Sequence, residues 1–411
     1  MGFQQGLSGL SASSKSLDVI GNNIANSNTT GFKASRTEFA NMVASAFGTA
    51  GNNAGIGVSV ADIAQQFTQG NISTTGSSTD LAINGNGFFA VQKSDGTMAY
   101  TRAGNFQLDK SGDLVTPSGA NVMGYTIDPT TGLRTSATLV PMSFPLGKTM
   151  AAKQTATASF TGNLDARVQD ATATTPPTPR QTYATSINVY DSQGVAVPVN
   201  MYFVKNGSNT WDVYDQLDDP TATPPVTASP VGQLVFDGNG NITSGSPLAL
   251  TVTPQPTNPN TPPTPFTVDV NLDNMTQYGT KFAINDAKQD GYTAGQLTNI
   301  NVGNDGKITA TYSNGVSQAE GQVALASFAN NQGLADVGNN LFMETSASGQ
   351  AVMGTAGTGI FGELRSGALE DSNVDLTAEL VNMMTAQRAY QANAQTIKTQ
   401  DQIMSTIVNL R

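Results

Sequence analysis

Apolar residues recur every three or four positions at both ends of the chain, a spacing typical of one face of an α-helix. At the amino terminus, five of the seven positions reached from Phe3 in steps of four and three residues are apolar. At the carboxyl terminus, eight of the ten corresponding positions from Leu376 to Val408 are apolar. The pattern predicts two long helices, which form a coiled-coil-like terminal domain from residues 1–31 and 372–411. The predicted apolar seam consists of Leu7, Leu10, Leu17, Ile24, Leu376, Leu380, Met383, Tyr390, Ile397, Met404 and Val408.

Polar residues add further signals to these helices. Ser372 to Asp375 fit a capping box at the start of the second helix, and Arg411 is favourable at the negative end of its dipole. The outer faces of both helices carry Gln, Asn, Ser, Thr and Ala, where an exposed helix usually carries Lys and Glu. Spacing alone leaves open a helical hairpin within one chain or a seam between chains. The uncharged outer faces favour burial against other copies.

Between the two ends, apolar and polar residues alternate in short runs separated by turn signals. Residues 81–115 and 297–315 have the pattern of strands joined at Asn-Gly and Asp-Gly turns. The predicted fold class is therefore mixed, with two mainly β domains inserted between terminal helices.

Proline marks the predicted division of the β region. Of the 19 prolines, 15 lie between residues 176 and 265, in loops rich in Pro and Thr. They indicate an inserted outer β domain at residues 147–283. The middle β domain is expected to comprise residues 71–146 and 284–371. Residues 32–70 lack strong periodicity and are expected to form an extended arm or hinge, with a disordered linker as the alternative.

The composition excludes several classes of function. The 411 residues include no Cys and no His, which removes thiol nucleophiles, His general bases and nearly every usual zinc or copper site. Thirty acidic and 19 basic residues give a net charge of -11, which argues against a nucleic-acid partner. No stretch has the length and hydrophobicity of a membrane span, and the amino terminus lacks the features of a cleaved secretory signal.

Several short stretches partly match motifs that carry chemistry in other proteins. GNGFFA at residues 85–90 fits a dinucleotide fingerprint but continues as strand, so a glycine hairpin is expected instead. GKT at residues 147–149 lacks the earlier Gly of a phosphate loop. DGNGN at residues 237–241 lacks the closing acid of a calcium loop, and the acids at 218–219 and 286–290 are expected to face solvent. The sequence therefore predicts no catalytic, cofactor or metal residue.

Two stretches of the first hundred residues, SLDVIGNNIANSNTTGFKASR and DLAINGNGFFAV, resemble the shared signature of bacterial flagellar axial proteins, the rod and hook components. Further stretches, among them SFTGNLDA and RSGALEDSNVDLTAELVNMMTAQRAYQANAQ, resemble the hook branch of that family in order along the chain. The departures are confined to the Pro and Thr loops. The residues that carry the amino-terminal motif are Asn22, Asn23, Asn26, Asn28, Thr29, Gly31 and Phe32.

The resemblance implies a structural subunit without enzymatic activity or cofactor. It implies that copies assemble into a curved helical tube, with the terminal helices lining an export channel and the β domains outside. Such a tube is a flexible joint that transmits torque from rod to filament. The implied partners are other copies, the distal rod, hook cap and hook-filament junction proteins, and the flagellar type III export apparatus. The implied location is the extracellular flagellum, reached without a cleaved signal peptide.

Two alternatives to a hook subunit remain at this point. One is a distal rod or hook-filament junction subunit, which the central motifs and the length disfavour. The other is a secreted carbohydrate-binding or hydrolytic β protein, suggested by the acidic charge, the loop-borne Asp and Tyr residues, and the single Trp211. The second alternative leaves both helical ends unexplained.

Overall fold

The structure is a computed structural model that describes residues 2–43, 55–129, 131–144, 149–171, 183–217, 228–254 and 264–409. The described chain is mostly β with one long helix near each end, as the hydrophobic periodicity predicts. It divides into two compact units. Unit 1 contains Met1–Leu146, Asn299–Thr311 and Ser317–Arg411, and unit 2 contains Gly147–Thr298 and Tyr312–Val316.

The two helices are α1 (Gly2–Ala25) and α2 (Leu376–Asn409). The Asp375 carboxylate caps α2 by accepting hydrogen bonds from the backbone N–H groups of Thr377 and Ala378, at 2.9 and 3.1 Å. The predicted capping box starting at Ser372 is therefore wrong. Ser372 Oγ accepts from the Val374 N–H at 3.3 Å, before the helix begins. Arg411 lies outside the described residues.

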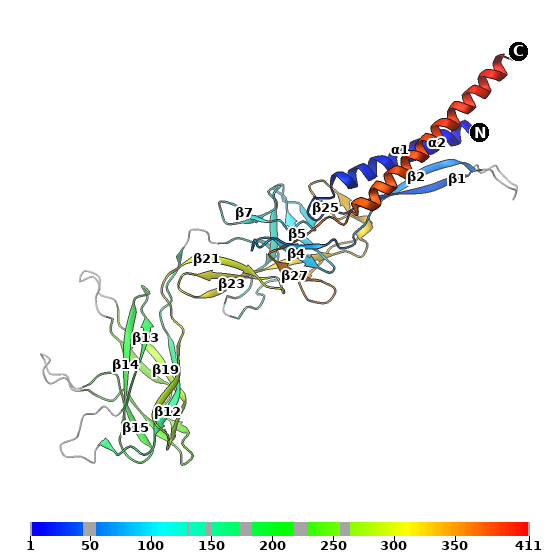
Figure 1. The fold of residues 1–411 in the computed structure, drawn as a ribbon. Coiled ribbons are helices and arrows are strands. Elements are labelled where there is room, and N and C mark those ends of the chain that lie inside the picture. Colours follow the sequence, from blue (N-terminus) through cyan, green and yellow to red (C-terminus); the bar gives the residue numbers. More distant parts are fainter. Residues whose placement is uncertain are drawn as a thin grey trace. The chain divides into compact units, whose positions relative to one another are not determined.

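A β-hairpin accompanies the helices. Strand β1 (Ser35–Val43) pairs antiparallel with β2 (Gly55–Gln65), with irregularities in the register after Glu38 and Met42. Figure 1 shows α1, α2 and this hairpin running side by side. Part of the segment for which the sequence predicts an arm is thus regular β-structure. The irregular register interrupts strict alternation, which explains why the pattern does not reveal these strands.

The β part of unit 1 is a large antiparallel sheet with two small pairs beside it. The sheet has the order β22-β23-β9-β5-β6-β25-β24, and the pairs are β27-β4 and β28-β3. The bounds are β3 Ile72–Thr74, β4 Leu81–Asn84, β5 Phe88–Gln92, β6 Met98–Thr101, β7 Gln107–Leu108, β8 Leu114–Val115, β9 Asn121–Tyr125, β10 Val140–Pro141, β22 Lys307–Tyr312, β23 Ser317–Ser327, β24 Ala335–Asp336, β25 Leu341–Met343, β26 Val352–Thr355, β27 Glu363–Ser366 and β28 Ala368–Glu370. A 3₁₀ turn, η2, covers Asn331–Gly333. The small pairs bring residues 363–370 back against residues 72–84.

One glycine turn that the sequence predicts for this sheet is present in the structure, and another is not. The turn at Asp95-Gly96 joins β5 to β6, with a Lys93 N–H to Thr97 O bond of 2.9 Å, as expected for a hairpin. The glycine hairpin predicted at residues 85–90 is wrong, because β4 pairs with β27 while β5 pairs with β6, β9 and β23. Gly85 and Gly87, with φ of +118° and +126°, instead redirect the chain between two sheets.

Unit 2 is a β-sandwich. A sheet of order β18-β19-β12-β20, in which β12 and β19 are parallel, shares one apolar core with a sheet of order β13-β14-β15-β16-β17. Trp211 is fully buried in that core, and its Nε1 donates to Gln277 Oε1 at 2.9 Å. The bounds are β11 Thr149–Met150, β12 Thr157–Asp165, β13 Tyr183–Tyr190, β14 Ala196–Lys205, β15 Thr210–Tyr214, β16 Gly232–Phe236, β17 Ile242–Ser244, β18 Leu248–Val252, β19 Phe266–Tyr278 and β20 Ala283–Gln289. A further strand, β21 (Gly295–Val302), has residues in both units, as does β22, whose last residue, Tyr312, belongs to unit 2. Most of the predicted Pro and Thr loops lie outside the described residues.

Candidate functional site

The terminal helices pack against each other through small residues. In α1, a Cβ built on Gly6 would lie 3.1 Å from Ile397 Cγ1, and one built on Gly9 would lie 2.8 Å from the Asn393 side chain. At the other end of the pair, Asn23 Nδ2 donates to Glu379 Oε1 at 3.1 Å. These contacts define an antiparallel pair. The buried residues of α1 are Gly6, Ala12, Val19, Ile20 and Asn23.

Most of the predicted seam lies outside this small-residue contact. Leu7, Leu376, Leu380, Tyr390 and Met404 are exposed, with Met404 at 56 % and Leu7 at 51 %. Leu10, Leu17, Ile24, Met383 and Ile397 are half-buried, and of these Ile397 contacts α1 at Gly6. The side chain of Val408 lies outside the described part of the chain. Within one chain, large apolar side chains on both helices therefore remain available to a partner.

A groove runs between the two helices and the hairpin. Its volume is about 590 Å³, and it is lined mostly by small and polar residues, among them Ala12, Ser16, Ala386 and Asn393. Phe39 from β1 also lines the groove, with 49 % of its surface exposed.

The polar motif at the end of α1 makes a local hydrogen-bond network. Asn23 is 1 % exposed, its Oδ1 accepts from the Ser35 N–H at 2.9 Å, and its Nδ2 donates to Ser35 O at 2.7 Å. Asn26 Nδ2 donates to the Asn22 backbone and side-chain oxygens, and Thr29 Oγ1 donates to Asn26 Oδ1. Asn23 thus fixes the start of β1 to the end of α1, because its amide satisfies both backbone groups of Ser35.

The remaining motif residues direct the chain toward the β part of unit 1. Gly31 has a φ of +69°, and its N–H donates to Glu370 O at 2.8 Å. A Cβ there would lie 2.5 Å from Ala103 N, so only glycine fits. Phe32 is half-buried, and its carbonyl accepts from the Asn373 N–H at 3.4 Å. Asn28 is exposed.

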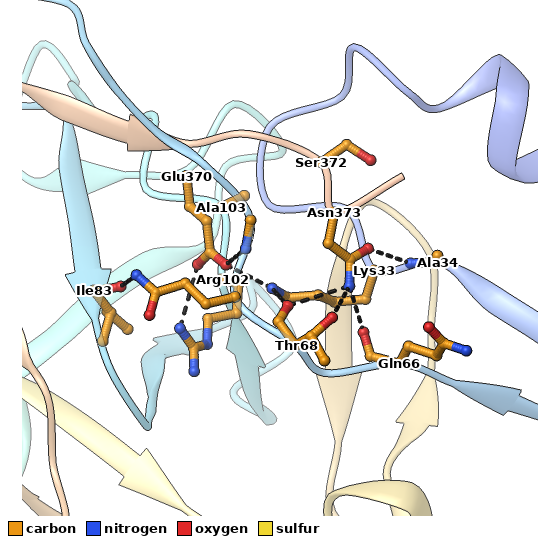
Figure 2. A network of polar contacts seen from close by, with 12 residues as sticks. Lys33, Ala34, Gln66, Thr68, Ile83, Arg102, Ala103, Glu370, Ser372 and Asn373 are labelled. Carbon is orange, nitrogen blue, oxygen red and sulfur yellow. Dashed lines mark hydrogen bonds and ion pairs between the residues drawn. The ribbon is translucent and has the colours of Figure 1, made fainter. Parts of the chain in front are cut away.

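A buried charge cluster lies next to this motif, and sequence reasoning missed it. Figure 2 shows Lys33, Arg102 and Glu370 pointing toward one another. Lys33 Nζ lies 2.6 Å from Glu370 Oε1, and Arg102 Nη1 lies 3.3 Å from Glu370 Oε2. The side chains of Lys33 and Glu370 are fully buried, and that of Arg102 is 5 % exposed. The three residues come from positions far apart in the sequence.

Backbone groups satisfy further polar atoms of the cluster, whereas Arg102 Nε is buried without a hydrogen-bond partner among the described residues. Lys33 Nζ also donates to Thr68 O at 2.8 Å, Arg102 Nη2 donates to Gly85 O at 2.9 Å, and the Gly70 N–H donates to Glu370 Oε1 at 2.9 Å. Burial lowers the pKa of Lys33 and of Arg102, and the Glu370 carboxylate opposes that lowering.

Asn373 joins the same segments. Its Oδ1 accepts from the Ala34 N–H at 2.8 Å, and its Nδ2 donates to Gln66 O at 2.7 Å and to Thr68 Oγ1 at 2.9 Å (Figure 2). We call the contacts among residues 31–34, 66–70 and 370–373, together with Arg102, the junction. The sequence did contain one signal for the buried charge cluster. Lys33 and Glu370 lie inside the two family motifs, in a chain in which only 12 % of the residues are charged.

The acidic residues of the other candidate motifs, where they are described, form turn hydrogen bonds or ion pairs with nearby residues. Asp237 Oδ1 accepts from the backbone of Asn239 and Asn241 in a tight turn. The Asn241 N–H is the main cause of the lowered pKa of the Asp237 carboxyl. Asp286 pairs with Lys288, and Asp290 with Lys153 at 3.0 Å. Residues 218–219 and 147–148 lie outside the described ranges.

The described residues offer neither a metal site nor a membrane-spanning helix. They contain no group of three or more His, Cys, Asp or Glu side chains that could hold a metal ion. Neither described helix has the length and hydrophobicity needed to cross a membrane.

Four family descriptions match segments of the chain. Residues 3–33 match the flagella basal body rod protein family, and residues 82–149 match the flagellar hook protein FlgE/F/G D1 domain. Residues 163–292 match the flagellar basal body protein FlaE D2 domain. Residues 365–410 match the flagellar basal body rod FlgEFG protein C-terminal family. These segments include both helices and most of unit 2.

The relatives match over essentially the full length. The chain is 45 % identical to the flagellar hook protein FlgE of Salmonella typhimurium and 44 % identical to that of Escherichia coli K12, with all of each chain covered. It is 34 % identical to the FlgE of Treponema pallidum, covering 99 % of this chain and 98 % of that one. The crystal structure of Helicobacter pylori flagellar hook protein FlgE2 has a similar fold, with a TM-score of 0.54 at 16 % identity. That match covers 72 % of this chain and 100 % of the other.

Proposed function

Because the chain belongs to the flagellar hook protein family, we propose that it is a structural subunit that polymerises through its terminal helices into the tube of the flagellar hook. The four family segments follow one another along the chain in the order expected of a hook subunit. The length and the match over all of the Salmonella typhimurium hook protein favour the hook over a rod or junction subunit.

The observation that supports this proposal best is the exposed apolar surface of α2. Leu376, Leu380, Val381, Met384 and Ile403 each expose between 46 and 52 % of their surface. Burying one such side chain stabilises an assembly by roughly 1 to 2 kcal/mol, and the gain is repeated in every copy. Large apolar side chains on a long helix with few charges are therefore suited to contacts between copies. Four of the predicted seam residues, Leu376, Leu380, Tyr390 and Met404, are exposed residues of α2.

The finer features of the function follow as parts of the same proposal. The antiparallel helices form a coiled-coil-like inner layer, and the sparse charge of α2 gives an export channel a wall with little electrostatic hold on a passing chain. Unit 2 makes outer contacts that slide when the tube bends, so the polymer is a flexible joint that transmits torque. Repeating a heterologous contact along a helix builds such a tube without any enzyme.

The remaining partners and the location belong to the same proposal. The partners are the distal rod, hook cap and hook-filament junction proteins, together with the flagellar type III export apparatus. The subunit is exported to the extracellular flagellum without a cleaved signal peptide.

A pair of matched double variants tests the role of α2. Leu380→Glu with Met384→Glu places two charges on the exposed apolar surface, while Gln391→Glu with Gln395→Glu makes the same change at exposed polar positions with equal spacing, outside the predicted seam. We expect the first pair to abolish sedimentable polymer and the second to retain most of it, because a buried unpaired charge is strongly unfavourable. Equal yields of polymer from both would refute the assignment.

A further inference from the structure

The junction has an unequal distribution of charge. Two cations, Lys33 and Arg102, share a single carboxylate, that of Glu370, and all three side chains are withdrawn from water. Arg102 also lies over the ring of Phe88, with Cζ 5.3 Å from the ring centroid. Thr68 O and Gly85 O accept from the two cations, but Glu370 is the only anionic group among these contacts. The presence of Arg102 further disfavours the charged form of Lys33.

Backbone groups of the junction are hydrogen-bonded by residues 370–373, the segment that begins with Glu370. The Gly31 N–H donates to Glu370 O, and the Ala34 N–H donates to Asn373 Oδ1. The Gly70 N–H donates to Glu370 Oε1, and the Gln66 carbonyl accepts from Asn373 Nδ2. Residues 370–373 thus supply partners to both flanks of the hairpin β1–β2. They also lead directly into α2, which begins at Leu376.

We propose that Glu370 is the closing residue of the junction, so that α1 and the hairpin cannot be fixed to the β part of unit 1 until residues 370–373 have docked. Without Glu370, two neighbouring cations would have to be buried without an anion. Removing one partner of a buried ion pair is much more costly than losing an exposed one, because the remaining charge stays desolvated. The amino-terminal segments therefore remain open while the carboxyl-terminal segment is absent.

Hydrogen exchange of the full chain tests the closure. Glu370→Gln removes the charge at nearly constant volume, and Glu363→Gln makes the same change at an exposed position in β27. We expect Glu370→Gln to raise the exchange rates of the Gly31, Ala34 and Gly70 amides by roughly 100- to 1,000-fold. Glu363→Gln should leave them within about threefold of the unmodified chain. Rates within threefold in both variants would overturn the proposal.

A double variant separates charge from packing. In Lys33→Met with Glu370→Gln, a single cation remains in the junction, so we expect the exchange rates to fall by roughly tenfold from those of Glu370→Gln alone. Rates equal to or above those of Glu370→Gln would show that packing, and not charge, holds the junction, and would also overturn the proposal.

Refolding of the unmodified chain provides a test that needs no variant. Under pulse labelling, the Gly31, Ala34 and Gly70 amides should gain protection together with, or after, those of β28. Protection of these amides ahead of β28 would contradict closure by the carboxyl-terminal segment. Failure of the chain to polymerise would count against the proposed function alone, since none of these measurements involves polymer.

Discussion

Gly31 shows how a single motif residue acts through the backbone. Its φ of +69° is one that L-amino acids with a side chain rarely adopt, and its Cα lies against the Arg102–Ala103 backbone. The short approach allows its N–H to reach Glu370 O. The family motif therefore needs glycine at this position for packing, independently of any contact with another copy.

Gly31→Ala should lower the free energy of unfolding of unit 1 by about 3 kcal/mol or more. Strain at a positive φ accounts for about 1 to 2 kcal/mol, and the clash with Ala103 N adds to it. Gly76→Ala is the matched control, because Gly76 has a φ of +79° and open space around it. Gly76→Ala should lower the free energy of unfolding only by the contribution from backbone strain. Urea unfolding followed by far-UV circular dichroism checks both, and equal losses would disprove a packing role for Gly31.

Tyr100 provides a prediction about alkaline stability. Burial, followed by the Glu344 carboxylate, raises the pKa of its phenol to about 12 from the ordinary value of 10. Since the folded pKa is raised, the associated stability is fully present below pH 10 and is lost as the pH rises toward 12. The difference in unfolding free energy between the unmodified chain and Tyr100→Phe should shift by about 2 to 3 kcal/mol across that range. A difference that stays constant from pH 9 to pH 12 would refute this.

At the residue scale, the sequence identified which residues form the amino-terminal motif but not what they contact. Asn23, one of these residues, hydrogen-bonds to Ser35 and Glu379 of the same chain. The Lys33–Glu370 contact joins residues 337 positions apart, and no local pattern records such a pairing.

At the scale of the elements, the close packing of α1 against α2 depends on a glycine of α1, which has no side chain. A Cβ on Gly9 would meet the Asn393 side chain at 2.8 Å, whereas a Cβ on Gly21 would meet nothing within 4 Å. The two glycines have the same helix propensity but different neighbours. Gly9 therefore permits close approach, and Gly21 has no such role within one chain.

Gly9→Leu should separate α1 from α2, because its side chain requires space that the pair does not have. We expect faster proteolysis within α2 by at least tenfold and little sedimentable polymer. Gly21→Ala should instead stabilise α1 by about 0.5 to 1 kcal/mol, as the helix propensities of Ala and Gly differ by that amount. Limited proteolysis with mass-spectrometric assignment of the cuts measures both. Equal protection of α2 in Gly9→Leu and the unmodified chain would contradict the small-residue contact.

The elements were predictable to the extent that each has a periodic apolar face. Helix α2 repeats its apolar positions over many turns, so its type and approximate bounds follow from spacing. The first residue of α2 does not follow from the spacing, because Ser372 and Asp375 are both good caps. Only the path of residues 370–373 decides between them. Strands β1 and β2 escaped prediction because the irregular register interrupts their alternation.

On the scale of the whole molecule, each unit has an apolar core of its own. The core of unit 2 surrounds Trp211, the single tryptophan of the chain, while Phe88, Phe328 and Phe342 pack edge to face in unit 1. Separate cores allow units to unfold separately. Variants of the helices and the junction are thus expected to act on unit 1.

Trp211 fluorescence should therefore report unit 2 independently of the assembly surface. In Leu380→Glu with Met384→Glu, and in Gly31→Ala, the midpoint of the fluorescence transition in urea should stay within about 0.2 M of that of the unmodified chain, because both sets of changes lie in unit 1. A change inside the unit 2 core serves as the positive control. Leu234→Ala, at a fully buried position, should lower the midpoint by roughly 1 M or more, since cavities of this kind cost about 2 to 5 kcal/mol. If the helix variants moved the Trp211 midpoint as far as Leu234→Ala does, the two units would unfold as one, and loss of polymer in those variants could not be attributed to the helix surface.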